Sequence, residues 1–159
     1  MSAQPAHLDV IGIGNAIVDV LGEVGDDFID AQKLIKGSME LIDEERRNHL
    51  YQAFPPSIER SGGSAANTMV GAAALGSRAG YIGKIRDDQV GAIFAHDIGA
   101  AGVAFATPRN PDGPASGLCL IAVTPDGERT MNTYLGASVE LTPADVDEQA
   151  VAGASVLYL

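Results

Sequence analysis

The feature of this sequence that most constrains its fold is an alternation of short apolar runs with longer segments of helical character. The apolar runs cover residues 8–13, 78–85 and 156–159, and each resembles a buried parallel strand. Helices are predicted over residues 43–53, 64–76, 87–102 and 141–154. Strands that alternate with helices in this way indicate an α/β fold.

A second group of strands does not fit this alternation. Residues 15–24 alternate in hydrophobicity, and residues 115–135 form two β-rich runs about a Pro-Asp-Gly turn at 125–127. Short extended pieces are expected at 39–42 and 57–61. These segments predict a small second sheet beside the main α/β core.

Length and charge limit the classes of function. With 159 residues the chain is expected to be one domain with a substantial core. Its formal net charge of −11 would be repelled by nucleic acid and by anionic membranes, so neither is expected as a partner. The single cysteine, Cys119, excludes an internal disulfide and fits a reducing cytoplasm, and no signal peptide or membrane-length apolar run is expected. We therefore expect a cytoplasmic protein.

Glycine pairs and histidines do not predict a dinucleotide, P-loop or metal site. Gly12-x-Gly14 lacks the third glycine of a dinucleotide fingerprint, since Ile17 stands there. Gly83-Lys84 is followed by Ile85, where a P-loop requires Ser or Thr. Both glycine pairs are interpreted as tight turns. The three histidines lie far apart in the sequence, so no metal site is predicted.

The pair Gly62-Gly63 precedes a helix, for which Ser64 is the expected N-cap. Asn67 then lies in the first helical turn, beside free backbone N–H groups, and its amide is costly to bury without a partner. Two interpretations stay open. Either these groups form a corner that binds a hydroxyl, or the small residues serve only close packing.

Asp19 places a carboxylate in an otherwise apolar alternating strand. A planar carboxylate can accept hydrogen bonds from two vicinal hydroxyls, as a sugar diol offers them. The alternative is a strand residue that faces solvent.

Four motifs together resemble the PfkB (ribokinase-like) carbohydrate kinase family, and most closely its adenosine kinase-like bacterial branch. They are VIGIGNAIVDV, GGSAANT, GYIGKIRDDQVG and TPDGERTMNTYLGAS, in this order. Met69 and Arg86 depart from the family's usual residues, outside the expected sugar contacts. The resemblance implies a doubly wound α/β sheet with a small β-lid, with lid segments near 15–24, 36–42, 57–62 and 115–135. It covers only the N-terminal half of such a protein, so the apolar run 156–159 is expected to be a buried central strand at which the fold is cut.

The resemblance also implies site residues. Asn15, Asp19, Gly63 and Asn67 would bind the sugar hydroxyls, and Arg129 would help to neutralise the transferring phosphoryl group, or be a solvated hairpin charge. An apolar pocket for a base, or ordinary lid packing, is expected at Met39, Leu41, Met131, Thr133 and Leu135. Asp87 and Asp88 are expected to cap the helix that follows rather than to bind metal.

The implied activity is transfer of the ATP γ-phosphate, with Mg²⁺, to the 5′-hydroxyl of adenosine. A kinase for another sugar, such as ribose or fructose, and a non-catalytic sugar- or nucleoside-binding protein remain the alternatives. The catalytic base, an aspartate in a Gly-Ala-Gly-Asp motif in this family, is absent from these residues. The expected partner is a small nucleoside or sugar, and the expected assembly is a monomer or a lid-mediated homodimer.

Overall fold

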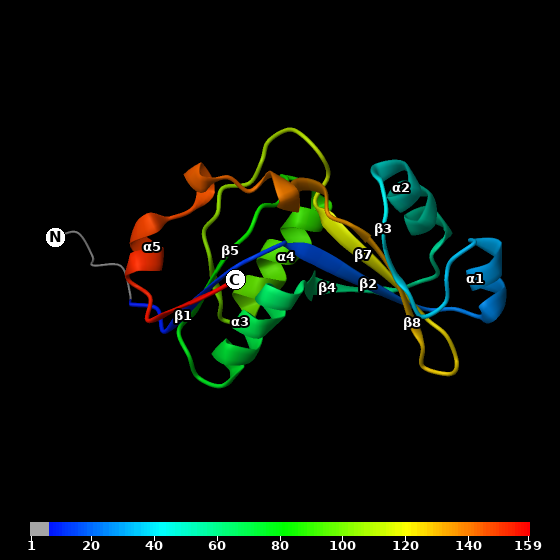
Figure 1. Ribbon diagram of the computed structural model, residues 1–159, viewed down its shortest axis with the longest axis horizontal. Helices are drawn as coiled ribbons and strands as arrows, with labels where there is room; N and C mark the ends of the chain where they lie inside the picture. Colours follow the sequence, from blue (N-terminus) through cyan, green and yellow to red (C-terminus); the bar gives the residue numbers. More distant parts are fainter. Residues whose placement is uncertain (1–6) are drawn as a thin grey trace.

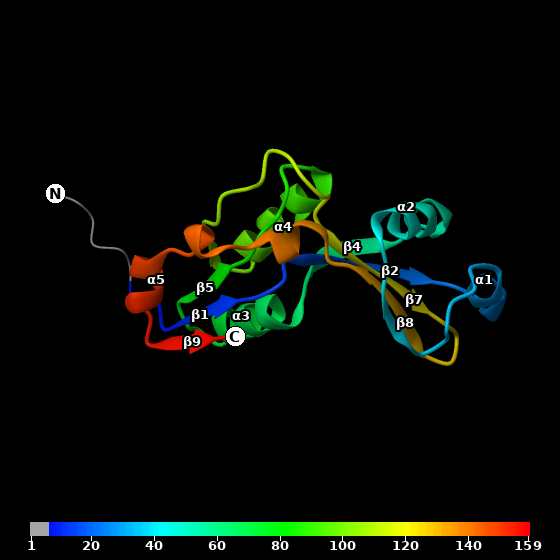
Figure 2. The same cartoon turned by 45° about the horizontal axis from the view of Figure 1, so that its top comes forward.

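A computed structural model describes residues 7–159 and contains two β-sheets, shown in Figures 1 and 2. The first sheet and its helices form one end of the molecule, and the second sheet extends from them toward helices α1 and α2. This arrangement confirms the predicted α/β fold with a small second sheet.

The first sheet is parallel, with the strand order β6-β5-β1-β9. Its strands are β1 (Val10–Ile13), β5 (Ala79–Ile82), β6 (Ala104–Phe105) and β9 (Val156–Tyr158). On one face, helices α3 (Ser64–Ala74) and α4 (Gln89–Ala100) bring Met69 against Gly12 and Phe94 against Tyr81. On the other face lie the 3₁₀ helix η2 (Pro143–Asp145) and helix α5 (Glu148–Ala152).

The second sheet has the strand order β3-β8-β7-β2-β4. Its strands are β2 (Ile17–Glu23), β3 (Met39–Leu41), β4 (Ile58–Gly62), β7 (Gly117–Val123) and β8 (Arg129–Tyr134). Strand β7 runs parallel to β2 and antiparallel to β8. One face of this sheet, which includes Val18, Val20, Leu118 and Leu120, is buried in the main core against α2 (Glu44–Ala53) and α4.

The chain passes repeatedly between the two sheets. It leaves the first sheet after β1 for β2, returns from β4 to α3, and enters the second sheet again at β7. It returns from β8 through the 3₁₀ helix η1 (Gly136–Glu140), while the short helix α1 (Asp26–Ala31) lies at the far end of the second sheet. The junction between the sheets is therefore built from segments distant in sequence.

Two sequence-based expectations are corrected. Ser64 is the first helical residue of α3, and the N-cap of the helix is Gly63. The backbone of Gly63 has a φ of +91°, and no side chain caps the helix. The helix predicted over 141–154 is broken at Val146, since Asp147 caps a new helix by accepting from the N–H groups of Gln149 and Ala150. The strand expected within 156–159 is present as β9, which lies at the edge of the sheet formed by residues 7–159 and has exposed side chains. That it is a buried central strand of the complete protein stays a prediction.

No helix within residues 7–159 has the length and hydropathy that a membrane span would need.

Candidate functional site at the junction of the two sheets

The cross-strand register of the second sheet brings most of the predicted site residues onto one face. Asp19 is paired with Cys119, Cys119 with Thr133, and Thr133 with Leu41. The adjacent row on the same face contains Leu21, Ile121, Met131 and Met39. Because directly paired residues project to the same side of a sheet, Asp19 lies in line with an apolar surface.

This apolar surface is partly open. Ile17, Cys119 and Ile121 form a small buried cluster, against which Leu21, Met131 and Leu135 pack. At the outer strand, Met39 is 56% and Leu41 is 64% exposed. A flat apolar group could therefore lie on this face without displacing the main core, which is on the opposite side.

The Asp19 carboxylate is half-buried beneath Gly62. A Cβ atom at Gly62 would lie 2.3 Å from Asp19 Cγ, so only glycine leaves room for the carboxylate there. Burial raises the pKa of Asp19 above its ordinary value. None of the ion pairs within residues 7–159 involves Asp19. A carboxylate in such a setting is a strong hydrogen-bond acceptor for hydroxyl groups.

Asn15 and Gly63 meet where the chain passes between the sheets. They line a cavity of about 270 Å³ together with Gly14, Ser64 and Ala65, which we call the junction groove. A Cβ atom at Gly63 would lie 2.6 Å from the Asn15 carbonyl oxygen, and the positive φ of Gly63 also disfavours any side chain. Ser64 and Ala65 are the first two residues of α3, so the N-terminus of this helix borders the groove.

Asn67 lies on α3, but it lines a different cavity. Its backbone N–H donates to the Gly63 carbonyl oxygen at 2.9 Å, and its exposed side chain borders a space of about 510 Å³ with Arg60, Ser61 and Asp97. Arg60 is paired with Asp19 across β2 and β4. The Asn67 cavity and the junction groove therefore flank the Gly62–Gly63 turn.

Arg129 is placed away from the other predicted residues. It is exposed and pairs with Val123 at the end of β8 nearest the 125–127 turn. Thr133 lies four positions further along β8, which corresponds to about 13 Å along the strand. The structure thus puts Arg129 on the same face as Asp19 but at its distal end.

Sequence reasoning did not identify Cys119, Ile17 or Arg60 as neighbours of Asp19. Thr133 Oγ1 donates to Cys119 Sγ at 3.2 Å, and burial raises the pKa of the Cys119 thiol to about 11. Residues 117–123 are apolar on both faces, so alternation could not show which side chains accompany Asp19. The pairing of β7 with β2 supplies that information.

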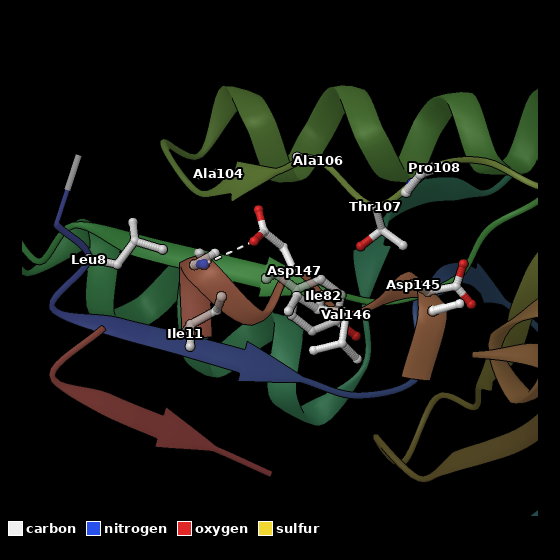
Figure 3. A pocket seen from close by; sticks show the side chains of 14 residues that line it. Leu8, Ile11, Ile82, Ala104, Ala106, Thr107, Pro108, Asp145, Val146 and Asp147 are labelled. Atoms are coloured by element: carbon white, nitrogen blue, oxygen red, sulfur yellow. Dashed lines mark hydrogen bonds between the residues drawn. The ribbon is translucent and has the colours of Figure 1, made fainter. Parts of the chain in front are cut away.

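A separate cavity of about 310 Å³ lies on the first sheet (Figure 3). Ile11 and Ile82 form part of its floor, and Val146 faces them from the segment that leads into α5. Asp145, which forms a buried ion pair with Lys84, borders one end. This cavity contains none of the predicted site residues.

Comparisons with known proteins show clear relatives. Residues 40–159 match the model of the pfkB family carbohydrate kinase. The structure of adenosine kinase from Sinorhizobium meliloti is 51% identical, with a TM-score of 0.88 over 96% of this chain and 47% of that one. A probable sugar kinase from Rhizobium etli CFN 42 is 48% identical, with a TM-score of 0.88 over 96% of this chain and 46% of that one.

Curated relatives match a shorter part. The 5-dehydro-2-deoxygluconokinase of Bacillus subtilis (strain 168) is 35% identical over 101 residues, which are 62% of this chain and 31% of that protein. Fructokinase-2 of Solanum habrochaites is 28% identical over 106 residues, which are 65% and 32%. The chain therefore spans about a third of the matched curated relatives and under half of the matched solved chains. Since the family model matches most of the sequence, the chain belongs to the pfkB family of carbohydrate kinases.

Proposed function

We propose that the protein to which these residues belong phosphorylates adenosine to AMP with ATP. The observation that carries the proposal is the position of Asp19. Its half-buried carboxylate lies on the same face of the second sheet as an apolar surface that includes Met131 and Leu41. A nucleoside has a diol at one end and a flat base at the other, which matches this arrangement. The similarity to the Sinorhizobium meliloti adenosine kinase supports the same substrate.

In this proposal Asp19 accepts hydrogen bonds from the ribose hydroxyls. Asn15 and Gly63 hold the sugar from the junction groove, and Asn67 contacts it from the other side of the Gly62–Gly63 turn. The base lies against the apolar face, whose proposed contacts are Met39, Leu41, Met131, Thr133 and Leu135. Arg129, further along the same face, is proposed to balance phosphate charge.

Mg²⁺ and ATP are proposed from the family membership. Within residues 7–159, no three His, Cys, Asp or Glu side chains gather into a group that could hold a metal ion. The described residues therefore do not fit a resident metal site, and we assign them only to binding and orienting the acceptor. Transfer of the γ-phosphate needs charge neutralisation and a nucleotide site in addition.

A second candidate is phosphorylation of a simple sugar. It is favoured by the fructokinase and 5-dehydro-2-deoxygluconokinase relatives. A sugar would use the Asp19 carboxylate but would leave most of the apolar face uncovered. The size of the apolar face is therefore the feature that separates the two candidates.

Thermal unfolding of the complete protein with added ligand tests the choice. A ligand that binds only the folded protein raises the melting temperature by mass action. We expect adenosine to raise it, and ribose or fructose at the same concentration to leave it unchanged. A shift with fructose or ribose and none with adenosine would replace adenosine by a sugar as the proposed substrate.

A further inference from the structure

Tyr81 contains an unusual buried hydroxyl. Its Oη is one of two buried side-chain polar atoms within residues 7–159 that have no hydrogen-bond partner, the other being Arg47 Nε. Tyr81 is only 2% exposed, and its ring packs on Phe94 and Phe105 at centroid distances of 5.8 and 6.1 Å. Burial raises the pKa of the phenol well above its ordinary value, so the hydroxyl remains a proton donor.

The hydroxyl end of Tyr81 lies behind the junction groove. A Cβ atom at Gly14 would be 3.6 Å from Tyr81 Oη and 2.8 Å from Ala65 Cβ. Gly14 and Ala65 both line the groove, and Gly14 immediately precedes Asn15. The buried donor is therefore separated from the groove by little more than the Gly14 backbone.

An acceptor borders the same space. A Cβ atom at Gly83 would be 2.9 Å from the Gly14 carbonyl oxygen and 3.1 Å from Tyr81 Cζ. The carbonyl and the phenol thus face one small gap that exists because residue 83 has no side chain. A buried hydroxyl without a partner is costly, and this carbonyl is an acceptor that borders the same gap.

We propose that Tyr81 is a positioning residue for the junction groove, whose hydroxyl donates to the Gly14 carbonyl oxygen when a substrate occupies the groove. The bond fixes the peptide that joins Gly14 to Asn15, and so orients the Asn15 side chain toward the substrate. The inference rests on the proposed function, because it requires the groove to hold the acceptor. Within residues 7–159 the hydroxyl has no other hydrogen-bond partner.

The test is Tyr81→Phe in the complete protein, with adenosine affinity measured by calorimetry and the melting temperature measured without ligand. Because the hydroxyl has no partner among residues 7–159, its removal should leave the unliganded melting temperature unchanged or raise it. Adenosine binding should weaken by roughly 2- to 12-fold, the range for one net hydrogen bond. Tyr51→Phe is the matched control, since the Tyr51 hydroxyl already donates to Glu59 Oε1 at 2.5 Å far from the groove. The control should leave adenosine affinity unchanged.

The measurements distinguish failure of the proposed function from failure of the proposed role of Tyr81. Wild-type protein that binds fructose instead of adenosine rejects the proposed substrate, and the same comparison is then made with fructose. Wild-type protein that binds neither rejects the proposed function, and the role of Tyr81 with it. Equal affinities of wild type and Tyr81→Phe for the bound ligand overturn the role of Tyr81 alone. A lower unliganded melting temperature for Tyr81→Phe also overturns it, because the hydroxyl would then have a partner, such as water, before substrate binds.

Discussion

The partly buried Asp19 carboxylate is expected to lower the stability of the fold while it serves substrate binding. Burial raises the pKa of Asp19, so the charged carboxylate lowers the free energy of unfolding at neutral pH. For a carboxyl group whose pKa is higher in the folded state, this cost is absent at low pH and develops as pH rises through the folded pKa. A charge kept at such a cost is consistent with a role in binding.

We predict that Asp19→Asn raises the unliganded melting temperature at pH 7, and that the gain declines as pH falls and the wild-type carboxyl group protonates. In the complete protein the same change should weaken adenosine binding by roughly 1.5–3 kcal/mol, the range for hydrogen bonds to a charged group. The loss should be smaller for 2′-deoxyadenosine, which lacks one hydroxyl partner. Equal losses for both nucleosides would contradict the diol role.

Glu23→Gln is the matched control for Asp19→Asn. Glu23 is on the same strand and the same face, but it is exposed at the strand end, four residues from Asp19. Its substitution should change neither the melting temperature nor nucleoside affinity measurably.

Asp88 shows how one side chain can join two elements. Its Oδ1 accepts from the Gly91 N–H at 2.7 Å and from Ser116 Oγ at 2.8 Å, and its Oδ2 accepts from the Ser116 N–H at 2.9 Å. Asp88 therefore caps α4 and holds the residue that precedes β7. Of the two aspartates expected to cap this helix, only Asp88 does so, while Asp87 pairs with Arg109 at the surface.

We predict that Asp88→Ala lowers the free energy of unfolding by about 2–4 kcal/mol, from loss of the cap together with an unsatisfied buried Ser116 N–H. Asp87→Ala should cost under about 0.5 kcal/mol, because an exposed ion pair contributes little. Urea denaturation of both variants measures the difference. Similar losses would show that Asp88 does not connect the two elements.

Sequence patterns located the elements better than their ends. Thr142 and Pro143 correctly marked a helix start, but the pattern could not show that Asp147 would begin a second helix within the same turn-rich stretch. Periodicity likewise placed β7 without its register, so Cys119 was not recognised as a neighbour of Asp19. Several nearby residues could cap a helix, and several registers could pair two strands. The local sequence does not determine which of them forms.

The division into two sheets was predictable because the surplus strands could not belong to the alternating core. The shape of the junction groove was not predictable from the sequence. It depends on how residues 14–16 approach Gly63 and on how Tyr81 lies behind them. These approaches are set by packing between distant segments. Motif resemblance named Asn15 and Gly63 as site residues, and the structure shows that they share a groove.

The final prediction concerns the 159-residue chain as a whole, which we expect to have no kinase activity by itself. Phosphoryl transfer needs a positioned base, charge neutralisation at the γ-phosphate and a nucleotide site. The sequence has no Gly-Ala-Gly-Asp motif, and residues 7–159 contain no cluster of metal-binding side chains.

The chain also covers only 47% of the Sinorhizobium meliloti adenosine kinase, and we expect it to contain the acceptor site without a complete donor site. Incubation of the purified chain with adenosine and Mg-ATP, followed by AMP detection, should give no turnover above a control without protein. A chain carrying Asp19→Asn distinguishes true turnover from a contaminating kinase, because only activity of this chain would fall with that change. Turnover that does fall would show that residues 1–159 already contain the base.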